Sequence, residues 1–372
     1  MNQKSGSTID SWQIGPFTPH GKTILESLPT LVFLCPVSGN NVEWAAKDVF
    51  NPGAILHDGK VFMLFRAEDR VGRYGGTSRI GLAISEDGIN FEVEPKPVIF
   101  PGDDPWQAWE WPGGCEDPRV VVSPEGGYLC FYTAFDGKSG CLFVASSRDM
   151  RCWTKHGPAF ASTPHVKRWS KSGSVITEIR DGRLVASRIN GRYWMYWGEG
   201  ICFAATSEDL IHWEPVEFDA TADRYLTYKG SQQALAWDIH RVPGHRVLRP
   251  IVFPRQGRFD SLLVEPGPPG VRTENGIVLI YNGANHPEHG DKTMPPFSYQ
   301  PGQILFDPGD PLACIHRTQA PFLLPGDIGV TLGQVNNVCF AQALVYFKDS
   351  WHLYYGMSDS RIGYATAPFT RN

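Results

Sequence analysis

Residues 147–153 read Ser147-Arg148-Asp149-Met150-Arg151-Cys152-Trp153, and the same pattern, Ser-x-Asp-x-x-x-aromatic, occurs twice more in the chain. The other copies are residues 85–91 and 207–213, so the three follow one another at intervals of roughly 60 residues. A segment that returns at a nearly fixed interval marks a structural unit that the chain repeats. We therefore expect the fold to be an array of similar units.

A second pattern, a polar turn that leads into a short aromatic strand, occurs five times. An apolar strand precedes each turn, as in a β-hairpin, and a third apolar run follows each pair. The turns are Asp58-Gly59-Lys60, Glu125-Gly126-Gly127, Asn190-Gly191-Arg192, Glu274-Asn275-Gly276 and Lys348-Asp349-Ser350. The third runs are residues 80–84, 141–146, 201–206, 302–306 and 362–365.

Five such units predict an all-β fold, a five-bladed β-propeller, because propeller blades are small antiparallel sheets set around a central channel. A pair of β-domains is the alternative architecture. We expect a single propeller domain over residues 1–372, with an N-terminal extension, about residues 1–45, packed on or near it. The largest insertion, residues 221–259, contains a helical pattern at residues 231–237.

In a propeller, the innermost strands of all blades begin at the channel, so residues that are distant in the chain meet there. The expected starts of these strands are polar: Asn51-Pro52-Gly53, residues 116–119, Lys171-Ser172-Gly173, Glu265-Pro266-Gly267 and Asn336-Asn337. Charged residues are rarely buried unless they are paired or used. The five polar starts therefore predict a central substrate pocket.

Composition argues against several classes of function. A formal net charge of -5 without a basic stripe argues against nucleic acid as a partner. The chain has no apolar run of 18 residues, so we expect no membrane span. The eight scattered cysteines and the polar first residues indicate a reduced, cytoplasmic protein. The eleven histidines lack metal-site spacing, so we expect neither a metal nor a cofactor. The sequence leaves open whether the chain forms a homo-oligomer.

One segment, Gly113-Gly114-Cys115-Glu116-Asp117-Pro118-Arg119, places two carboxylates and a guanidinium directly before an apolar strand. Several further segments, taken together with it and in this order, resemble glycoside hydrolase family 130, the mannoside phosphorylases and mannosidases, whose fold is a five-bladed propeller. These segments are Asn51-Pro52-Gly53, Phe65-Arg66-Ala67 with Asp69, Thr77-Ser78-Arg79-Ile80-Gly81-Leu82-Ala83, Lys171-Ser172-Gly173, Gly267-Pro268-Pro269, and Tyr354-Tyr355-Gly356 with Ser358-Asp359-Ser360.

The resemblance implies that Asp117 is a general acid, which protonates the glycosidic oxygen through a hydroxyl of the bound mannosyl unit. It also implies residues that hold the oligosaccharide substrate: Asn51, Arg66, Asp69, Arg119 and Asp359. We add Glu116, Lys171 and Asn282 to the substrate-binding set. Repulsion from Glu116 raises the pKa of a neighbouring Asp117, whereas Arg119 opposes that shift, and the sequence does not rank the two effects.

The chain departs from the phosphorylases of the family at two positions. Where they usually carry His-Arg-Pro, this chain has Trp197-Gly198-Glu199-Gly200, and where they carry Tyr-His-Gly it has Tyr281-Asn282-Gly283. Two cationic groups expected to bind phosphate are thus missing, and a further carboxylate, Glu265, precedes Gly267. This pattern favours an inverting β-mannosidase with Asp117 as acid and Glu199 or Glu265 as base.

Alternatives remain open at this point. A β-mannoside phosphorylase releasing mannose 1-phosphate would take inorganic phosphate as its co-substrate and hold it with Arg168, Lys171 or Arg188. A non-catalytic propeller would bind glycans without needing Asp117. Glu199 alternatively accepts sugar hydroxyls, and Lys171 pairs with a glutamate or binds a substrate hydroxyl. Three tryptophans, Trp106, Trp109 and Trp111, stack on sugar or pack the propeller.

Overall fold

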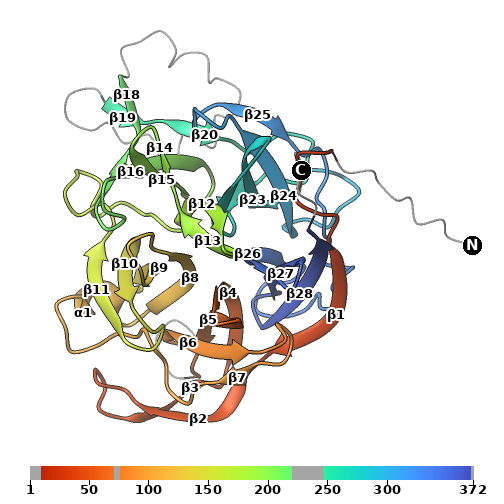
Figure 1. Ribbon diagram of the computed structural model, residues 1–372. Helices are drawn as coiled ribbons and strands as arrows, with labels where there is room; N and C mark the ends of the chain where they lie inside the picture. Colours follow the sequence, from red (N-terminus) through yellow and green to blue (C-terminus); the bar gives the residue numbers. More distant parts are fainter. Residues whose placement is uncertain (1–9, 71–75, 220–245, 370–372) are drawn as a thin grey trace, which may run out of the picture.

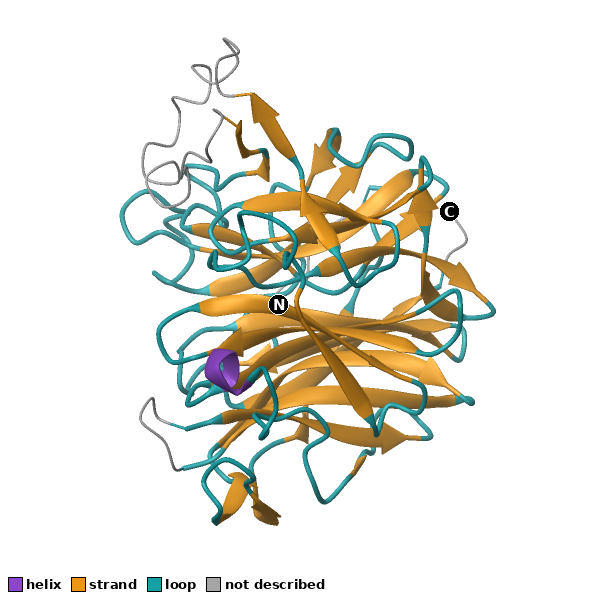
Figure 2. Cartoon of the chain, turned by 90° about the vertical axis from the view of Figure 1, so that its left-hand side faces the viewer, coloured by secondary structure: helices purple, strands orange, loops and turns teal. Residues whose placement is uncertain are grey.

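The computed structural model describes residues 10–70, 76–219 and 246–369, and nearly all their regular structure is β. The antiparallel strand pairings form five blades around a common axis (Figure 1), which confirms the predicted five-bladed propeller. One short helix, α1 (Gln107–Glu110), lies at the edge of the described part (Figure 2). The helical pattern at residues 231–237 lies outside the described residues.

The blades follow the chain in order. Blade 1 consists of β4 (Asp48–His57), β5 (Lys60–Glu68), β6 (Ser78–Ser85) and β7 (Glu92–Val93). Blade 2 consists of β8 (Gly114–Val122), β9 (Tyr128–Phe135), β10 (Gly140–Ser147) and β11 (Trp153–Pro158). Blade 3 consists of β12 (Ser174–Arg180), β13 (Arg183–Ala186), β14 (Arg188–Ile189), β15 (Arg192–Trp197), β16 (Cys202–Ser207) and β17 (Trp213–Pro215).

Blade 4 consists of β21 (Leu263–Pro266), β22 (Gly270–Thr273), β23 (Gly276–Ala284), β24 (Tyr299–Phe306) and β25 (Cys314–Arg317). Blade 5 consists of β26 (Cys339–Phe347), β27 (Ser350–Met357), β28 (Arg361–Pro368) and β1 (Thr18–Leu25). Because β1 pairs with β28, the N-terminal segment supplies the outer strand of the last blade. Shorter pairs flank the ring: β2 (Leu28–Leu34) with β3 (Asn41–Ala45), β18 (Glu217–Asp219) with β19 (Arg246–Leu248), and β20 (Pro250–Val252) on β16.

The repeated Ser-x-Asp motif has a local structural cause. In blade 2, the Ser147 hydroxyl accepts a hydrogen bond from the Met150 N–H at 2.9 Å, and Asp149 Oδ1 accepts from the Cys152 N–H at 2.8 Å. The copies at residues 85–91 and 207–213 make the same bonds. The motif therefore satisfies the backbone of the turns β6–β7, β10–β11 and β16–β17, each of which leads into the last strand listed for its blade.

The hydrophobic core is divided among the spaces between neighbouring blades. Successive side chains of a strand point to opposite faces, and both faces of a blade are covered by another blade. In β9, Tyr128, Cys130 and Tyr132 pack toward blade 1, whereas Leu129 and Phe131 pack toward blade 3. This two-sided burial explains why the predicted strands are apolar runs rather than alternating patterns. The rings of Trp106 and Trp109 contact Phe143 in the same core, as the packing alternative predicted.

Polar side chains near the axis tie the inner strands of different blades together. Gln342 Nε2 donates to the carbonyls of Asn51 (3.0 Å) and Pro118 (2.9 Å), which links blades 5, 1 and 2. Strands β4 and β8 also approach each other closely, since a Cβ atom on Gly53 would lie 2.5 Å from the Pro118 carbonyl oxygen. These contacts fix the inner strands of blades 1, 2 and 5 relative to one another next to Asn51 and Pro118.

Candidate active site

The site residues lie at irregular points of the inner strands. Register shifts interrupt the β4–β5 pairing at Asn51 and the β8–β9 pairing at Asp117. Asn51, Asp117 and Ser172 adopt the left-handed backbone region, with φ of 47°, 52° and 60°. Such conformations are strained for residues other than glycine, although Asn and Asp tolerate them best. These kinks turn polar side chains toward the axis where regular strands would present apolar ones.

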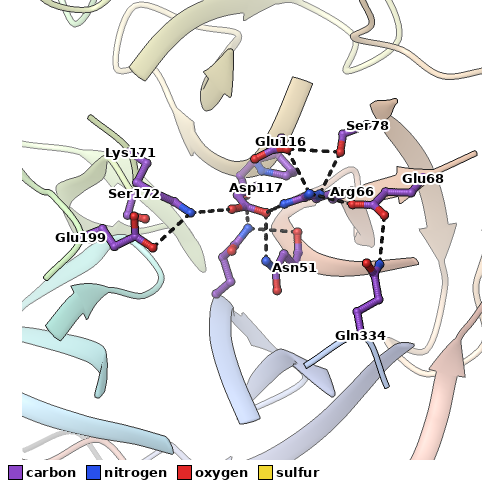
Figure 3. A network of polar contacts seen from close by, with 12 residues as sticks. Asn51, Arg66, Glu68, Ser78, Glu116, Asp117, Lys171, Ser172, Glu199 and Gln334 are labelled. Carbon is purple, nitrogen blue, oxygen red and sulfur yellow. Dashed lines mark hydrogen bonds and ion pairs between the residues drawn. The ribbon is translucent and has the colours of Figure 1, made fainter. Parts of the chain in front are cut away.

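Asp117 is buried and surrounded by donors. Its Oδ1 accepts hydrogen bonds from Asn51 Nδ2 at 2.9 Å and from Arg66 Nη1 at 3.2 Å, while Oδ2 lies 3.5 Å from Lys171 Nζ (Figure 3). Burial alone raises the pKa of this carboxyl, but the charges of Arg66 and Lys171 outweigh it and hold the pKa well below its usual range. The sequence weighed only Glu116 against Arg119, whereas in the structure Arg66 and Lys171 have the larger effect on this pKa and Arg119 lowers it further.

Arg66 binds the carboxylates on one side of the site. Its guanidinium donates to Glu68 Oε1 at 2.7 Å, lies 3.0 Å from Glu116 Oε1 and donates to the Ser78 hydroxyl at 3.0 Å. Burial raises the pKa of Glu116 to about 7, and repulsion from Asp117 adds to this shift against the attraction of Arg66. Of the two adjacent acids, Glu116 is therefore the one that retains a proton near neutral pH.

Lys171 binds the carboxylates on the other side. Its ammonium lies 3.5 Å from Asp117 Oδ2, 3.8 Å from Glu199 Oε1 and 4.0 Å from Glu265 Oε1. Burial lowers the pKa of Lys171, but these carboxylates raise it well above the usual range, so the side chain stays charged. The three predicted catalytic carboxylates, from blades 2, 3 and 4, thus converge on one nitrogen (Figure 3 shows Asp117 and Glu199).

The Lys171 distances bound the separation of acid and base. Asp117 Oδ2 and Glu265 Oε1 lie at most roughly 7.5 Å apart, because both are close to the same ammonium, so they are near enough to act on one glycosidic bond. Glu265 is 2% exposed, and its Oε1 accepts a hydrogen bond from the Ser172 hydroxyl. Burial raises its pKa to about 7 in spite of Lys171. Glu265 is thus a buried carboxyl poised to exchange a proton near neutrality.

Comparisons with known proteins agree with this arrangement. A profile of glycoside hydrolase family 130, described as beta-1,4-mannooligosaccharide phosphorylase, matches residues 29–221 and 216–371. The chain belongs to this family. This confirms the resemblance that the sequence motifs indicated.

Two curated family 130 relatives come from Thermoanaerobacter sp. strain X514. A beta-1,2-mannobiose phosphorylase is 28% identical over 333 residues, covering 87% of this chain and 91% of that protein. A 1,2-beta-oligomannan phosphorylase is 29% identical over 348 residues, covering 92% and 96%.

Solved structures are closer in sequence. A glycosyl hydrolase from Bacteroides ovatus is 39% identical with a TM-score of 0.87, covering 98% of both chains. Another structure, 40% identical with a TM-score of 0.86, covers 98% of this chain and 99% of that one. Its description reads "The GH130 family of mannoside phosphorylases contains glycoside hydrolases that target beta-1,2 mannosidic linkages in Candida mannan".

Three predicted sugar-binding residues of this family 130 protein have side chains engaged in structural contacts. Arg119 donates to the carbonyls of Gly267 and Pro266, at 3.0 and 2.8 Å. The Asn282 amide pairs with both backbone groups of Ala341. The oxygens of Asp69 accept from the Thr77 N–H at 2.8 Å and from Arg79 at 2.5 Å. All three are buried, so the geometry gives them positioning roles; direct sugar binding stays a prediction.

Asp359 and Asn51 lie near the charges of Asp117 and Arg66. Asp359 has a φ of 50°, and burial raises its pKa to about 6 against the attraction of Arg66. Asn51 donates to Asp117, as described above, and is 6% exposed. Their contact with sugar remains a prediction, but both face the same charged cluster as the acid.

Several residues around the site were not anticipated from the sequence. The Ser172 hydroxyl donates a hydrogen bond to Glu265. The Glu68 carboxylate accepts hydrogen bonds from Arg66, Lys47 and Gln334. Tyr299, at the start of β24, has its pKa raised by burial and by the nearby charges of Glu265 and Glu199. Lone hydroxyls and aromatic rings carry no charge pattern in a sequence, and only the flanking position of Ser172 beside Lys171 was a usable signal.

Other parts of the described structure give less support for a functional site. No group of three or more His, Cys, Asp or Glu residues able to hold a metal ion occurs within residues 10–70, 76–219 and 246–369. No helix in the described part is long and apolar enough to cross a membrane. A cavity of about 470 Å³ lies away from the carboxylates around Lys171 and is lined by residues 11–15, residues 178–179 of β12, residues 271–275 of blade 4, Trp351 and Phe369.

Proposed function

We propose that this protein hydrolyses β-mannosidic bonds in manno-oligosaccharides with inversion of the anomeric configuration. The observation that carries the proposal is the cluster in which Glu199 and Glu265 flank Lys171, opposite Asp117. Two glutamates stand where family phosphorylases usually have a cation or a small residue, so the site has fewer positive charges to hold phosphate. Glu265 can serve as a base for water.

The reaction assigns one role to each end of the cluster. Asp117 gives a proton, through a hydroxyl of the bound mannosyl unit, to the glycosidic oxygen as the bond between that oxygen and C1 breaks. A water molecule bonds to C1 from the opposite face and passes its proton to a glutamate. We assign this base to Glu265, because it is buried with a pKa of about 7, whereas the Glu199 side chain is 30% exposed.

The proton of the acid is held by a pair of groups. Glu116 and Asp117 are adjacent and share Arg66, so they titrate as one unit. With the pKa of Glu116 raised to about 7 and that of Asp117 lowered, the pair keeps one proton up to about neutral pH. That proton is available to the relay when substrate hydroxyls rearrange the hydrogen bonds of Asp117.

The pH dependence follows from these two pKa values. Below about pH 7, Glu265 becomes protonated and cannot accept a proton, and above about pH 7 the Glu116–Asp117 pair loses the proton that the acid needs. We expect kcat/KM to be bell-shaped with its maximum near neutrality and limbs that fall about tenfold per pH unit. Rates measured from about pH 5 to about pH 9 test this. A flat profile over that range would contradict the assignment.

Phosphorolysis is the second candidate, and the curated relatives favour it, since both Thermoanaerobacter proteins are named as phosphorylases. The deciding experiment incubates the protein with β-1,2-mannobiose, with and without inorganic phosphate, and identifies the products. We expect free mannose alone, at a rate that phosphate does not increase. Mannose 1-phosphate formed only with phosphate would replace hydrolysis by phosphorolysis. Binding of the disaccharide without turnover would support the glycan-binding alternative.

We also propose a cytoplasmic location. The cysteines of the described part are free, and most of them are buried in the cores between blades. Free cysteines suit a reducing compartment. Fractionation of the producing cells, with the protein followed by an antibody, tests this location.

A further inference from the structure

An exposed aromatic ring borders the carboxylate cluster. Trp169 lies two residues before Lys171, and its side chain is 43% exposed, unlike the almost fully buried aromatics of the blade cores. Its indole N–H donates a hydrogen bond to Glu199 Oε2 at 2.9 Å. The same carboxylate presents Oε1 toward Lys171 at 3.8 Å, which is longer than a hydrogen bond. Glu199 thus has one oxygen fixed by tryptophan and the other directed into the site.

The Trp169 ring is held in place from behind. It contacts the edge of Phe135 with ring centroids 6.4 Å apart, and it passes beside Gly140, where a Cβ would lie 3.7 Å from the ring. The next residue, Ser170, anchors the segment with two hydrogen bonds. Its N–H donates to the Gly140 carbonyl at 3.0 Å, and its hydroxyl oxygen accepts from the Leu142 N–H at 2.9 Å. A supported ring loses little conformational freedom when a ligand stacks on it.

The exposed fractions of the side chains distinguish a buried part of the site, its floor, from a part open to solvent, its mouth. Asp117 is 3% exposed and Glu265 2%, whereas Trp169 is 43% exposed and the Glu199 side chain 30%. In the proposed reaction, the mannosyl unit that is transferred lies between Asp117 and the water molecule that Glu265 activates, so it occupies the floor. A second sugar ring, linked to the first and leading out to solvent, passes the exposed pair. The sugar at the mouth is therefore the leaving group.

We propose that Trp169 and Glu199 form the subsite for the leaving-group sugar. The apolar face of that pyranose stacks on the indole ring, and its hydroxyls donate to Glu199 Oε1. This inference rests on the proposed function and deepens it, because it makes Glu199 a sugar-binding residue and leaves Glu265 as the base. The indole N–H keeps the Glu199 carboxylate in the orientation that receives the sugar.

Two substrates separate this role from that of a base. In β-1,2-mannobiose the leaving group is a sugar, whereas in β-mannosyl fluoride it is fluoride, which has no ring to stack. The experiment compares the ratio of kcat/KM for mannobiose to kcat/KM for the fluoride in the wild type and in Trp169→Ala, Trp169→Phe and Glu199→Gln. Ile315→Ala is the matched control, since Ile315 is 45% exposed and lies on the outer strand β25.

We expect the ratio to fall roughly 30-fold in Trp169→Ala, mainly through a higher KM for mannobiose. Trp169→Phe keeps a ring but removes the N–H, so its ratio should fall by less, and Glu199→Gln should lower the ratio by roughly tenfold. Glu265→Gln, in contrast, should slow both substrates together. Ile315→Ala should leave the ratio unchanged.

Each other result overturns the subsite. An unchanged ratio in Trp169→Ala shows that the ring does not hold the leaving group. Equal losses on both substrates in Glu199→Gln show that Glu199 acts on the reacting atoms rather than on the leaving sugar. If the wild-type protein cleaves neither substrate, the proposed function fails and the subsite with it. If the wild-type protein cleaves both substrates and the variants show the wild-type ratio of kcat/KM values, only the subsite proposal fails.

Discussion

The variant Asp117→Asn is expected to cleave mannobiose at least about 10³-fold more slowly than the wild type. Asparagine has nearly the same shape and still accepts hydrogen bonds from Asn51 and Arg66 through its oxygen. It has no proton to give to the glycosidic oxygen, and it removes the negative charge that faces Lys171. The loss should therefore fall on kcat, measured by release of free mannose.

Three comparisons make this result specific. Because Asp117 is buried between two cations, its replacement leaves charge uncompensated, so thermal unfolding must show that the variant is folded. Glu116→Gln removes the carboxyl that holds the pair's proton near neutrality, so it should shift the alkaline limb of the pH profile to lower pH and reduce the rate at neutral pH. The fluoride, which departs without protonation, should suffer a much smaller loss in Asp117→Asn. If Asp117→Asn kept a tenth of wild-type activity on mannobiose, Asp117 would not be the acid.

The architecture was accessible from the sequence because its cause is local and repeated. The Ser-x-Asp motif bonds to the backbone of its own turn, as at Ser147 and Asp149, so it signals one position in each of three blades. The apolar runs reflect strands buried on both faces. The polar strand starts were equally visible: those with Asp117, Lys171 and Glu265 meet at the Lys171 ammonium, and Asn51 joins them through Asp117. Asn336 and Asn337 were wrongly taken as a strand start, since β26 begins at Cys339 and Asn336 is exposed.

The hydrogen-bond and ion-pair partners of those polar groups could not be predicted from the sequence. Arg119 was expected to hold sugar, yet its guanidinium bonds to the carbonyls of Pro266 and Gly267 in another blade. A sequence shows a charge but not which of many distant carbonyls will satisfy it. The pKa of Asp117 depends likewise on Arg66 and Lys171, which come from the blades on either side, rather than on its neighbour in the chain. Trp169 lacked a charge pattern and emerged only through its bond to Glu199.

Glu265→Gln should reduce hydrolysis of both mannobiose and β-mannosyl fluoride by about 10³-fold. The amide has the size of the carboxyl and its oxygen still accepts from the Ser172 hydroxyl, so packing is preserved, but it cannot take a proton from water. Ser172→Ala is the matched control: it removes the hydrogen bond but keeps the base, and we expect a loss below tenfold. Initial rates on both substrates give the comparison.

Chemical rescue distinguishes a missing base from a damaged site. In Glu265→Ala, azide can occupy the space of the carboxylate and bond to C1 as the leaving group departs, which needs no base and yields mannosyl azide with inverted configuration. Azide should restore activity to Glu265→Ala and not to Asp117→Asn. Glu265 has a different role if the protein is a phosphorylase, because phosphate then supplies the nucleophile. Removing a negative charge that lies 4.0 Å from Lys171 would in that case leave phosphorolysis intact or faster, and such a result would exclude Glu265 as the base.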